Sequence, residues 1–414
     1  MASAQSNWLS LEDALTQTLS LTSQIVETET LALSDALSRV TGIDILASSN
    51  IPPWDNSSMD GYAVRCEDLS TSSSLPVAAT VFAGASDVAP LESGTAARIM
   101  TGAPVPQGAD TVIIQENVNR ENDSITPAIL PSRGDNIRVC GSDISQGECV
   151  VAKGTRLTPS HLMLLASLGI TEVCVYRKLK VGLMATGDEL CPPGENLGSG
   201  QIYESNSTGI SALLSEFAVE IINYGIVKDD VGSLTSTIKE AASEVDILIT
   251  SGGVSVGDAD HVKPVVESLG SVDFWKVAIK PGKPFAFGRV DNMIFCGVPG
   301  NPVSAYVTTQ MLVIPVIERL QGIHQLTAPL RMPARLAAPL SRRAGRTDFQ
   351  RATMWQETGE WHVKPLSKQS SGVMSSVTQA NCYLVLPAQQ AEFSAGERVT
   401  VVPFSQRMAT ENTE

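Results

Sequence analysis

Strand and helix patterns alternate between residues 179 and 250. Apolar runs that suit buried strands cover residues 180–186, 220–227 and 245–250, and helical patterns at 209–217 and 234–242 separate them. Strand–helix units of this length build a mainly parallel sheet, and such sheets bind ligands at the carboxyl ends of their strands. We therefore expect a doubly wound α/β domain with a binding site where the strands end.

Glycine-containing turns stand at two of these strand ends. The first strand runs into Thr186-Gly187-Asp188-Glu189, and a later one runs into Ser251-Gly252-Gly253. Glycine has no Cβ and lets a phosphate-bearing ligand approach the backbone. In Pro299-Gly300-Asn301-Pro302, Asn301 suits a helix N-cap and Pro302 the first helical position, so this turn is expected to offer free N–H groups to an anion. Together the turns predict one shared site.

A lysine cluster lies between the second and third turns. Residues 274–280 read as one strand, which places Lys276 and Lys280 on the same face because side chains alternate along a strand. The segment Lys280-Pro281-Gly282-Lys283-Pro284 follows and adds a third ammonium group. The alternative is a solvated edge strand, but three lysines this close together in an acidic chain favour anion binding.

Composition limits the chemistry. The formal net charge of −15 argues against nucleic acid as a ligand, because binding its phosphates needs a basic surface. The 7 cysteines form no CxxC pair and the 4 histidines are isolated, so we expect reduced thiols and no zinc site. Carboxylates without such partners suit Mg²⁺. No apolar run reaches the about 18 residues of a membrane span, and the start has no signal-peptide pattern, so we expect a cytoplasmic protein.

The rest of the chain divides into further units. Helical patterns cover residues 11–19 and 31–40, short β runs between Gly, Pro, Asn and Asp turns fill 75–151, and strands without helices continue past about 327. The expected fold is multidomain α/β plus β. Its parts are a discontinuous helical domain (1–50 and 147–178), an inserted β domain (51–146), the central α/β domain (179–327) and a C-terminal β-barrel-like domain (328–406).

Six motifs in one order extend over nearly the whole chain. They are Pro52-Pro53-Trp54-Asp55-Asn56-Ser57-Ser58-Met59-Asp60-Gly61-Tyr62, Thr101-Gly102-Ala103, Thr186-Gly187-Asp188-Glu189-Leu190, Ser251-Gly252-Gly253-Val254-Ser255-Val256-Gly257-Asp258, Lys280-Pro281-Gly282-Lys283-Pro284 and Pro299-Gly300-Asn301-Pro302-Val303-Ser304. Together they closely resemble the molybdopterin molybdenumtransferases, the MoeA family that includes the gephyrin E domain.

The resemblance implies a function and an assembly. Such an enzyme acts in molybdenum cofactor biosynthesis: it takes adenylylated molybdopterin and molybdate, inserts molybdenum into the dithiolene and releases AMP in a Mg²⁺-dependent step. The implied assembly is an elongated homodimer of four-domain subunits, with residues 1–50 and 147–178 as the dimerisation domain. The cleft is expected between the α/β domain of one subunit and the β domain of the other, and the upstream molybdopterin adenylyltransferase is an expected partner.

The resemblance also assigns roles to single residues. Those matching the pterin and nucleotide cleft are Asp188, Ser251, Gly252, Gly253, Ser255, Asp258, Pro299 and Pro302. Glu189 and Asp260 are candidates for binding Mg²⁺ or positioning the phosphoanhydride, since a metal there offsets the charge that develops as AMP leaves. The candidates for the molybdate oxyanion are Lys276, Lys280 and Ser371. The catalytic positions that a partner subunit would bring are Asp60, Thr101 and Asp143.

Two other functions stay open. The molybdopterin adenylyltransferases load AMP onto the pterin with the same α/β core, but they typically carry a Thr-Gly-Gly-Thr-Gly turn and lack the flanking β domains. A gephyrin-like E domain also serves as a dimeric scaffold for peptides, so the chain could instead be chiefly a binding module. Charged strand ends favour catalysis over a scaffold. A charged cleft costs desolvation free energy, and peptide binding by a scaffold does not require such a cleft.

Overall fold

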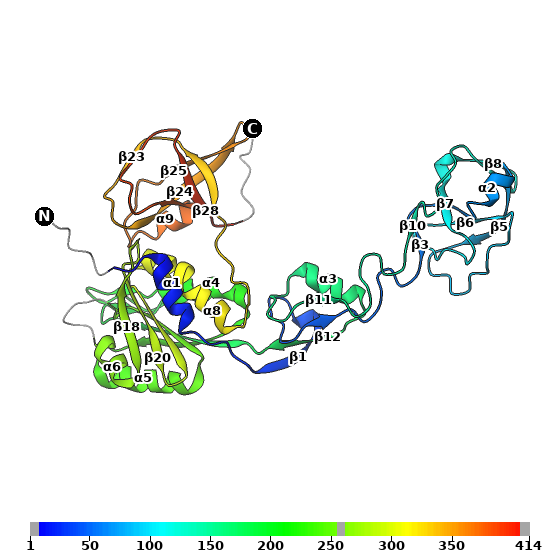
Figure 1. The fold of residues 1–414 in the computed structure, drawn as a ribbon. Coiled ribbons are helices and arrows are strands. Elements are labelled where there is room, and N and C mark those ends of the chain that lie inside the picture. The colour runs from blue at the N-terminus through cyan, green and yellow to red at the C-terminus, as the bar shows by residue number, and fades with distance from the viewer. Residues whose placement is uncertain (1–7, 255–260, 406–414) are drawn as a thin grey trace.

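The computed structural model describes residues 8–254 and 261–405 and is elongated (Figure 1). The α/β sheet lies at one end of the molecule with the C-terminal strands above it. A narrow arm of paired strands leads away from the sheet to a small β module at the other end. The division of the chain into four domains with the boundaries given above stays a prediction, and the parts are described here by their own contacts.

A six-stranded sheet forms the α/β part, in the order β16-β13-β17-β21-β20-β18. The first four strands are parallel to one another, and β20 and β18 run antiparallel to their neighbours. The strands are β13 (Leu179–Thr186), β16 (Val219–Val227), β17 (Ile247–Ser251), β18 (Ser271–Lys276), β20 (Pro284–Val290) and β21 (Met293–Val298). The short strands β14 (Leu190–Cys191) and β15 (Ile202–Tyr203) pair beside it.

Helices cover both faces of this sheet. The helical segments are α4 (Asn206–Leu214), η3 (Ser215–Phe217), α5 (Val231–Glu244), α6 (Val262–Leu269), α7 (Pro302–Thr308), η4 (Thr309–Val313) and α8 (Ile314–Leu320). Leu234 of α5 and Val262 of α6 pack with Phe295 on one face. On the other face the N-terminal helix α1 (Leu11–Ser20), capped by Ser10, joins the core of α4, α7 and α8 and contacts α8. Continuous apolar strands buried on both faces are what a parallel sheet requires.

The C-terminal strands close into a barrel. The sheet runs β19-β24-β25-β22-β28-β26, and β26 pairs back onto β24. Its strands are β19 (Ile279–Lys280), β22 (Met332–Leu336), β24 (Thr347–Glu357), β25 (Glu360–Pro365), β26 (Cys382–Leu386) and β28 (Arg398–Pro403), beside β23 (Leu340–Ser341) and β27 (Glu392–Phe393). The expectation that helices cease past 327 is wrong at one point, because Ser375–Gln379 forms the short helix α9.

The far β module is a curled sheet in the order β7-β4-β6-β5-β9-β8. Its strands are β4 (Gly61–Val64), β5 (Leu75–Val81), β6 (Ala96–Ile99), β7 (Thr111–Ile114), β8 (Val118–Glu121) and β9 (Ser124–Pro127), with α2 (Asp68–Thr71) and η2 (Gln115–Asn117) between them. The pair β3 (Asn56–Ser57) and β10 (Ile137–Arg138) lies where the arm enters the module.

The arm differs from the sequence expectation. Residues 31–40 were expected to be helical, but the chain forms strand β1 (Thr28–Ala32) and the 3-10 turn η1 (Leu33–Asp35). The reason is tertiary, since β1 pairs with β12 (Glu172–Tyr176) along its whole length. The elements beside them are β2 (Ile45–Leu46), β11 (Cys149–Val151) and α3 (Pro159–Ser167). Throughout the described part of the chain, none of the helices combines the length and apolar character needed to cross a membrane.

Candidate functional site

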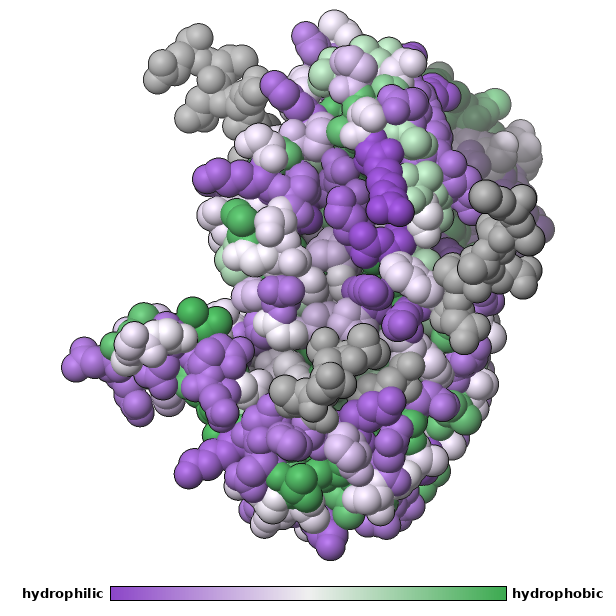
Figure 2. Space-filling view, turned by 90° about the vertical axis from the view of Figure 1, so that its left-hand side faces the viewer, coloured by the Kyte–Doolittle hydropathy of each residue, from purple (hydrophilic) through white to green (hydrophobic). Residues whose placement is uncertain are grey.

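Two adjoining cavities open at the carboxyl edge of the α/β sheet. One has a volume of about 380 Å³ and we call it the acidic cavity, because Glu189, Glu204 and Asp229 line it. The other has a volume of about 720 Å³ and we call it the basic cavity, because Lys280, Lys283 and Arg346 line it. Glu189 and the turn glycines at 252, 253 and 300 belong to both linings. Figure 2 looks onto the side where the barrel meets the α/β part, and hydrophilic side chains gather along the surface between them.

The floor shared by both cavities is built from glycine turns. Gly252 follows β17 with φ +91°, and a Cβ there would lie 2.5 Å from the carbonyl oxygen of Thr186. Gly253 has φ +65°, and its Cβ would lie 2.2 Å from Cγ2 of Val262. A Cβ on Gly300 would be 3.6 Å from Cα of Gly252, so the turns after β17 and β21 pack against each other. At Gly252 and Gly253 the positive φ and these close contacts exclude a side chain, which leaves the backbone bare toward the cavities.

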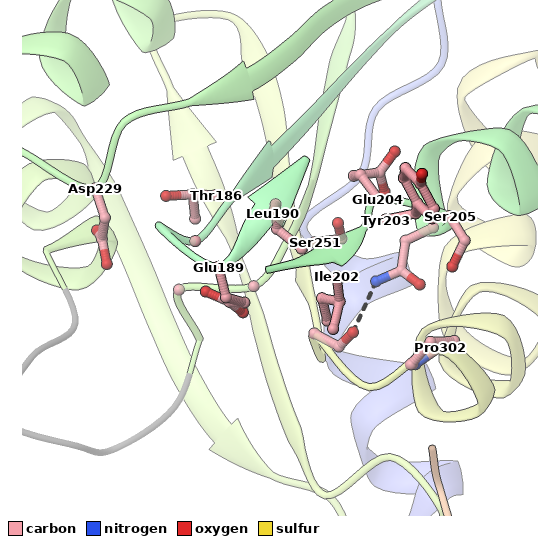
Figure 3. A pocket seen from close by; sticks show the side chains of 15 residues that line it. Thr186, Glu189, Leu190, Ile202, Tyr203, Glu204, Ser205, Asp229, Ser251 and Pro302 are labelled. Carbon is pink, nitrogen blue, oxygen red and sulfur yellow. Dashed lines mark hydrogen bonds between the residues drawn. The ribbon is translucent and has the colours of Figure 1, made fainter. Parts of the chain in front are cut away.

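Polar groups of the acidic cavity come from three strand ends and from α4 (Figure 3). Glu204 is buried and accepts the backbone N–H of Ser207 at 2.9 Å, and the Asn206 side chain donates to the Gly300 carbonyl at 2.8 Å. Oδ1 of Asp229 is buried and has no hydrogen-bond partner among the residues that the structure describes. A buried carboxylate oxygen without a donor is costly unless a cation or ligand faces it.

The donor set of this cavity can be tested against a divalent cation. Within residues 8–254 and 261–405 no three His, Cys, Asp or Glu side chains gather as a ready metal cage. Mg²⁺ does not need one, because it usually takes one or two carboxylates and fills the rest with water and substrate phosphate. Glu189 and the unpartnered Oδ1 of Asp229, which line the same cavity, are oxygen donors of the type that Mg²⁺ takes. The other predicted metal ligand, Asp260, lies outside the described residues, as do Ser255 and Asp258.

The basic cavity gathers cations from two parts of the chain. Lys280 ends β19, Lys283 follows it on the loop before β20, and Arg346 comes from the segment before β24. Nζ of Lys280 lies 3.3 Å from Oδ2 of Asp348, a carboxylate whose side chain is 2% exposed. Ser371 and Pro299 also line this cavity, and Pro302 lines both. The lining is suited to an oxyanion, because Lys283 and Arg346, which form no ion pair within the described residues, converge with Lys280 on one hollow.

Two expectations about this region are wrong. Residues 274–280 do not form one strand: β18 ends at Lys276, and β19 joins the barrel by pairing with β24. Lys276 and Lys280 thus belong to different sheets, and only Lys280 appears among the cavity residues. The break arises because the N-terminal segment inserts here, with Ala278 donating to the carbonyl of Leu9.

The turn before α7 also differs from expectation. Asn301 occupies the N-cap position, but its side chain makes no capping hydrogen bond. The backbone N–H of Val303, expected to be free for an anion, donates to the carbonyl of Ser371 at 3.1 Å. This contact fixes the α7 end to the loop that carries Ser371, so the turn serves to hold the cavity wall.

The remaining predicted residues lie elsewhere. Asp188 is exposed and lines neither cavity, although its neighbour Glu189 lines both. The predicted set omitted Asp229, which follows β16 and stands at a strand end like the others, so the signal for it was available. It also omitted Arg346, which no motif marks and which reaches the cavity only through the barrel.

Asp60 directly precedes β4 and Thr101 follows β6 in the far β module, whereas Asp143 lies on the connection between β10 and β11 (Figure 1). The backbone N–H and the hydroxyl of Thr101 donate to Oδ1 of Asp60 at 2.8 and 2.9 Å. These two bonds, the backbone one first, hold the pKa of Asp60 below its ordinary value. Asp143 is exposed on that connection, next to the strand pair at Ile51.

Comparison with known proteins identifies the family. A curated molybdopterin molybdenumtransferase of Haemophilus influenzae is 45% identical over 399 residues, which is 96% of this chain and 99% of the relative. The chain belongs to the molybdopterin molybdenumtransferase family. A molybdopterin molybdenumtransferase of Bacillus subtilis is 34% identical over 395 residues, 93% of this chain and 92% of the relative.

Family models and solved structures agree with this assignment. The models matched are the MoeA N-terminal region (domain I and II) at residues 9–169, a probable molybdopterin binding domain at 182–319 and the MoeA C-terminal region (domain IV) at 333–404. A molybdopterin biosynthesis MoeA protein from Pyrococcus horikoshii OT3 matches with a TM-score of 0.81 and 31% identity, covering 96% of this chain and 100% of that one. The two cavities fall on the part matched by the molybdopterin-binding model and its border with the barrel.

Proposed function

We propose that this chain is an enzyme of molybdenum cofactor biosynthesis that inserts molybdenum from molybdate into adenylylated molybdopterin and releases AMP. The observation that carries the proposal is the pair of adjoining cavities, one lined by carboxylates and the other by cations, around a common glycine floor. Family membership supplies the substrate class, since curated relatives are named molybdopterin molybdenumtransferase.

The reaction needs the molybdate oxyanion and the phosphate end of the adenylylated pterin to be held side by side. With molybdate bound in the neighbouring cavity, water splits the phosphoanhydride of the adenylylated pterin to give AMP. The two dithiolene thiols then bond to molybdenum, and their protons leave with one molybdate oxygen as water, so no oxidant or reductant is needed. A cationic wall suits the tetrahedral dianion, and a carboxylate pair suits the phosphate end. The shared floor brings the two reacting groups within reach of each other.

In this proposal the basic cavity binds molybdate. Lys280 and Ser371 were expected there, and Lys283 and Arg346 share their cavity. Positive charges preorganised around a hollow favour an oxyanion without reorganisation at the moment of reaction. Lys276 is dropped from this role because it ends β18 and lines none of the cavities described above. The bare backbone at Ser251, Gly252 and Gly253 would contact the pterin or nucleotide.

Glu189 and Asp229 would hold Mg²⁺ beside the phosphoanhydride, with Asp260 as a further candidate outside the described residues. Bound there, Mg²⁺ supplies positive charge that offsets the negative charge growing on the AMP phosphate. Glu189 itself stands between the two cavities, so it is placed to orient the phosphoanhydride against the oxyanion.

The assembly belongs to the same proposal. We propose a homodimer in which the partner's far β module and the connection between its β10 and β11 bring its Asp60, Thr101 and Asp143 to this cleft, because in one chain the arm holds that module away from it (Figure 1). Cytoplasmic location and delivery of substrate by a molybdopterin adenylyltransferase are further parts of the proposal.

Reconstitution of a molybdenum-free apoenzyme tests the function. Purified protein is incubated with adenylylated molybdopterin, Mg²⁺ and molybdate, and activity of the added apoenzyme is measured. Activity that depends on molybdate supports the proposal. If molybdopterin and ATP are converted to adenylylated pterin instead, the chain is an adenylyltransferase, and inactivity in both assays leaves the scaffold.

A further inference from the structure

A third cavity borders the basic cavity on the barrel side. Its volume is about 460 Å³, and it is lined by Trp8, Arg342, Arg343 and the segment 344–346, with Lys280 on the border. Lys280 and Arg346 line both this cavity and the basic one, whereas Trp8 lines only the third. The indole therefore lies behind the cations Lys280, Lys283 and Arg346, which we call the cationic wall, as seen from the proposed molybdate site.

The indole contacts two of the wall's cations. Nζ of Lys283 lies 5.0 Å from the centre of the Trp8 ring, and Cζ of Arg346 lies 5.6 Å from it. Both distances fall within the range of a cation–π contact, in which the negative face of the ring attracts a positive charge. The two cations come from different parts of the chain, so the single indole joins the α/β loop to the barrel.

Backbone hydrogen bonds fix where this indole sits. Leu9 donates to the carbonyl of Lys276 at 3.0 Å, and Ala278 donates to the carbonyl of Leu9 at 2.7 Å. Leu9 thereby pairs in parallel with Val277, and Leu11 is buried in the main core two residues later. Trp8 is held next to the segment that leads into Lys280 and Lys283, because its neighbour Leu9 is bonded to Lys276 and Ala278.

The kind of contact matters for an anion site. Neither Lys283 nor Arg346 forms an ion pair within the described residues, although Lys280 is paired with Asp348. A carboxylate would hold these cations but would also cancel the charge that an oxyanion needs. An aromatic ring restrains them and leaves their net charge intact.

We propose that Trp8 is a positioning residue of the oxyanion site, which holds Lys283 and Arg346 in place without neutralising them. The inference rests on the proposed function, because it takes the basic cavity as the molybdate site. It goes beyond that function by assigning a role to a residue that touches neither substrate.

Equilibrium dialysis of molybdate against purified full-length protein is the primary test, because it needs no turnover. Trp8→Leu keeps apolar bulk and removes the π face, Trp8→Phe restores a ring, and Trp355→Leu makes the same change in the barrel, where Trp355 stacks on His362. We expect Trp8→Leu to weaken molybdate binding by about fivefold or more, Trp8→Phe to recover part of the loss, and Trp355→Leu to change nothing.

Turnover kinetics separate positioning from folding. Trp8→Leu is expected to raise KM for molybdate by a similar factor, about fivefold, while kcat at saturating molybdate stays within about twofold. In a Lys283→Met background the same Trp8→Leu change should cost less, since one of the two cations it restrains is already gone. Thermal melting of each variant shows whether the fold is intact.

The outcomes separate the two proposals. If the natural sequence binds molybdate and Trp8→Leu binds it equally well, the role of Trp8 is refuted and the function stands. Equal losses in Trp8→Leu and Trp8→Phe, or full additivity with Lys283→Met, also refute it, because the ring would then act only as packing. If the natural sequence itself does not bind molybdate, the proposed function and this inference fall together.

Discussion

Replacement of Lys280 by methionine should separate the two things that this side chain does. Methionine keeps an unbranched stem of similar length and removes the charge. In the structure Nζ of Lys280 lies 3.3 Å from Oδ2 of Asp348, with the lysine side chain 43% exposed and the aspartate 2% exposed. Lys280→Met therefore removes one proposed molybdate contact. It leaves the buried carboxylate with Gln350 as a hydrogen-bond donor at 3.1 Å and with Arg342, whose Nη1 lies 4.0 Å from Oδ2.

The two consequences differ in size. A hydrogen bond to a charged group contributes about 1.5–3 kcal/mol, so KM for molybdate should rise about 10- to 100-fold. Breaking a fully buried pair costs about 3–5 kcal/mol, but solvent screens the half-exposed lysine, so we expect a loss of only about 1 kcal/mol in unfolding free energy. Urea unfolding measures the second effect, and molybdate-dependent turnover measures the first.

A double variant serves as the control. Asp348→Asn in the Lys280→Met background removes the carboxylate charge that has lost its lysine partner and keeps an oxygen that can accept from Gln350. Stability should return only in part, because buried Arg342 then loses its carboxylate partner, and the molybdate defect should persist. The reasoning is refuted if Lys280→Met lowers stability but leaves KM for molybdate within about twofold of the natural value, since Lys280 would then serve only Asp348.

Three further predictions follow from the same geometry. Gly252→Ala should abolish turnover and lower the free energy of unfolding by more than the about 1–2 kcal/mol of a left-handed alanine, because the new Cβ also meets a backbone oxygen at 2.5 Å. Gly94→Ala, with φ +75° and no atom within 4 Å, should cost only the conformational part, so equal losses in urea unfolding would contradict this. Thr101→Val removes the hydroxyl that helps lower the pKa of Asp60, so an NMR titration should show the Asp60 pKa raised but still below its ordinary value. The stability linked to the depressed pKa is present above the ordinary carboxyl range and is lost as pH falls through the folded-state pKa. Mixing inactive Asp60→Asn and Glu189→Gln dimers should restore about one quarter of natural activity if the cleft is shared between subunits, because half the dimers are mixed and each mixed dimer has one intact site. No recovery after verified subunit exchange would exclude the shared cleft.

The strands of the α/β sheet could be predicted because their burial leaves a strong pattern. β13 and β17 are buried along nearly their whole length, and their sequences are continuous apolar runs bounded by helical patterns. The glycine turns that follow these strands were recognisable by their position, because parallel sheets bind ligands at the carboxyl ends of their strands. The site's floor was thus readable from local sequence.

Contacts between distant segments could not be predicted in this way. Residues 31–40 have helical spacing, yet β1 forms because β12 offers it a partner more than a hundred residues later. The strand expected at 274–280 breaks because Leu9 inserts beside Val277. Arg346 reaches the basic cavity because β24 pairs with β19, and nothing near it in sequence signals that contact.

AMP release in the presence and absence of molybdate tests the central claim most directly. Adenylylated molybdopterin and Mg²⁺ are incubated with the protein, and AMP is quantified by chromatography as molybdate is titrated. The account predicts that AMP release rises with molybdate, saturates, and matches the amount of molybdenum bound to the pterin one for one. AMP release at the same rate without molybdate, or molybdenum insertion without AMP release, would contradict the claim that the two cavities work on one coupled reaction.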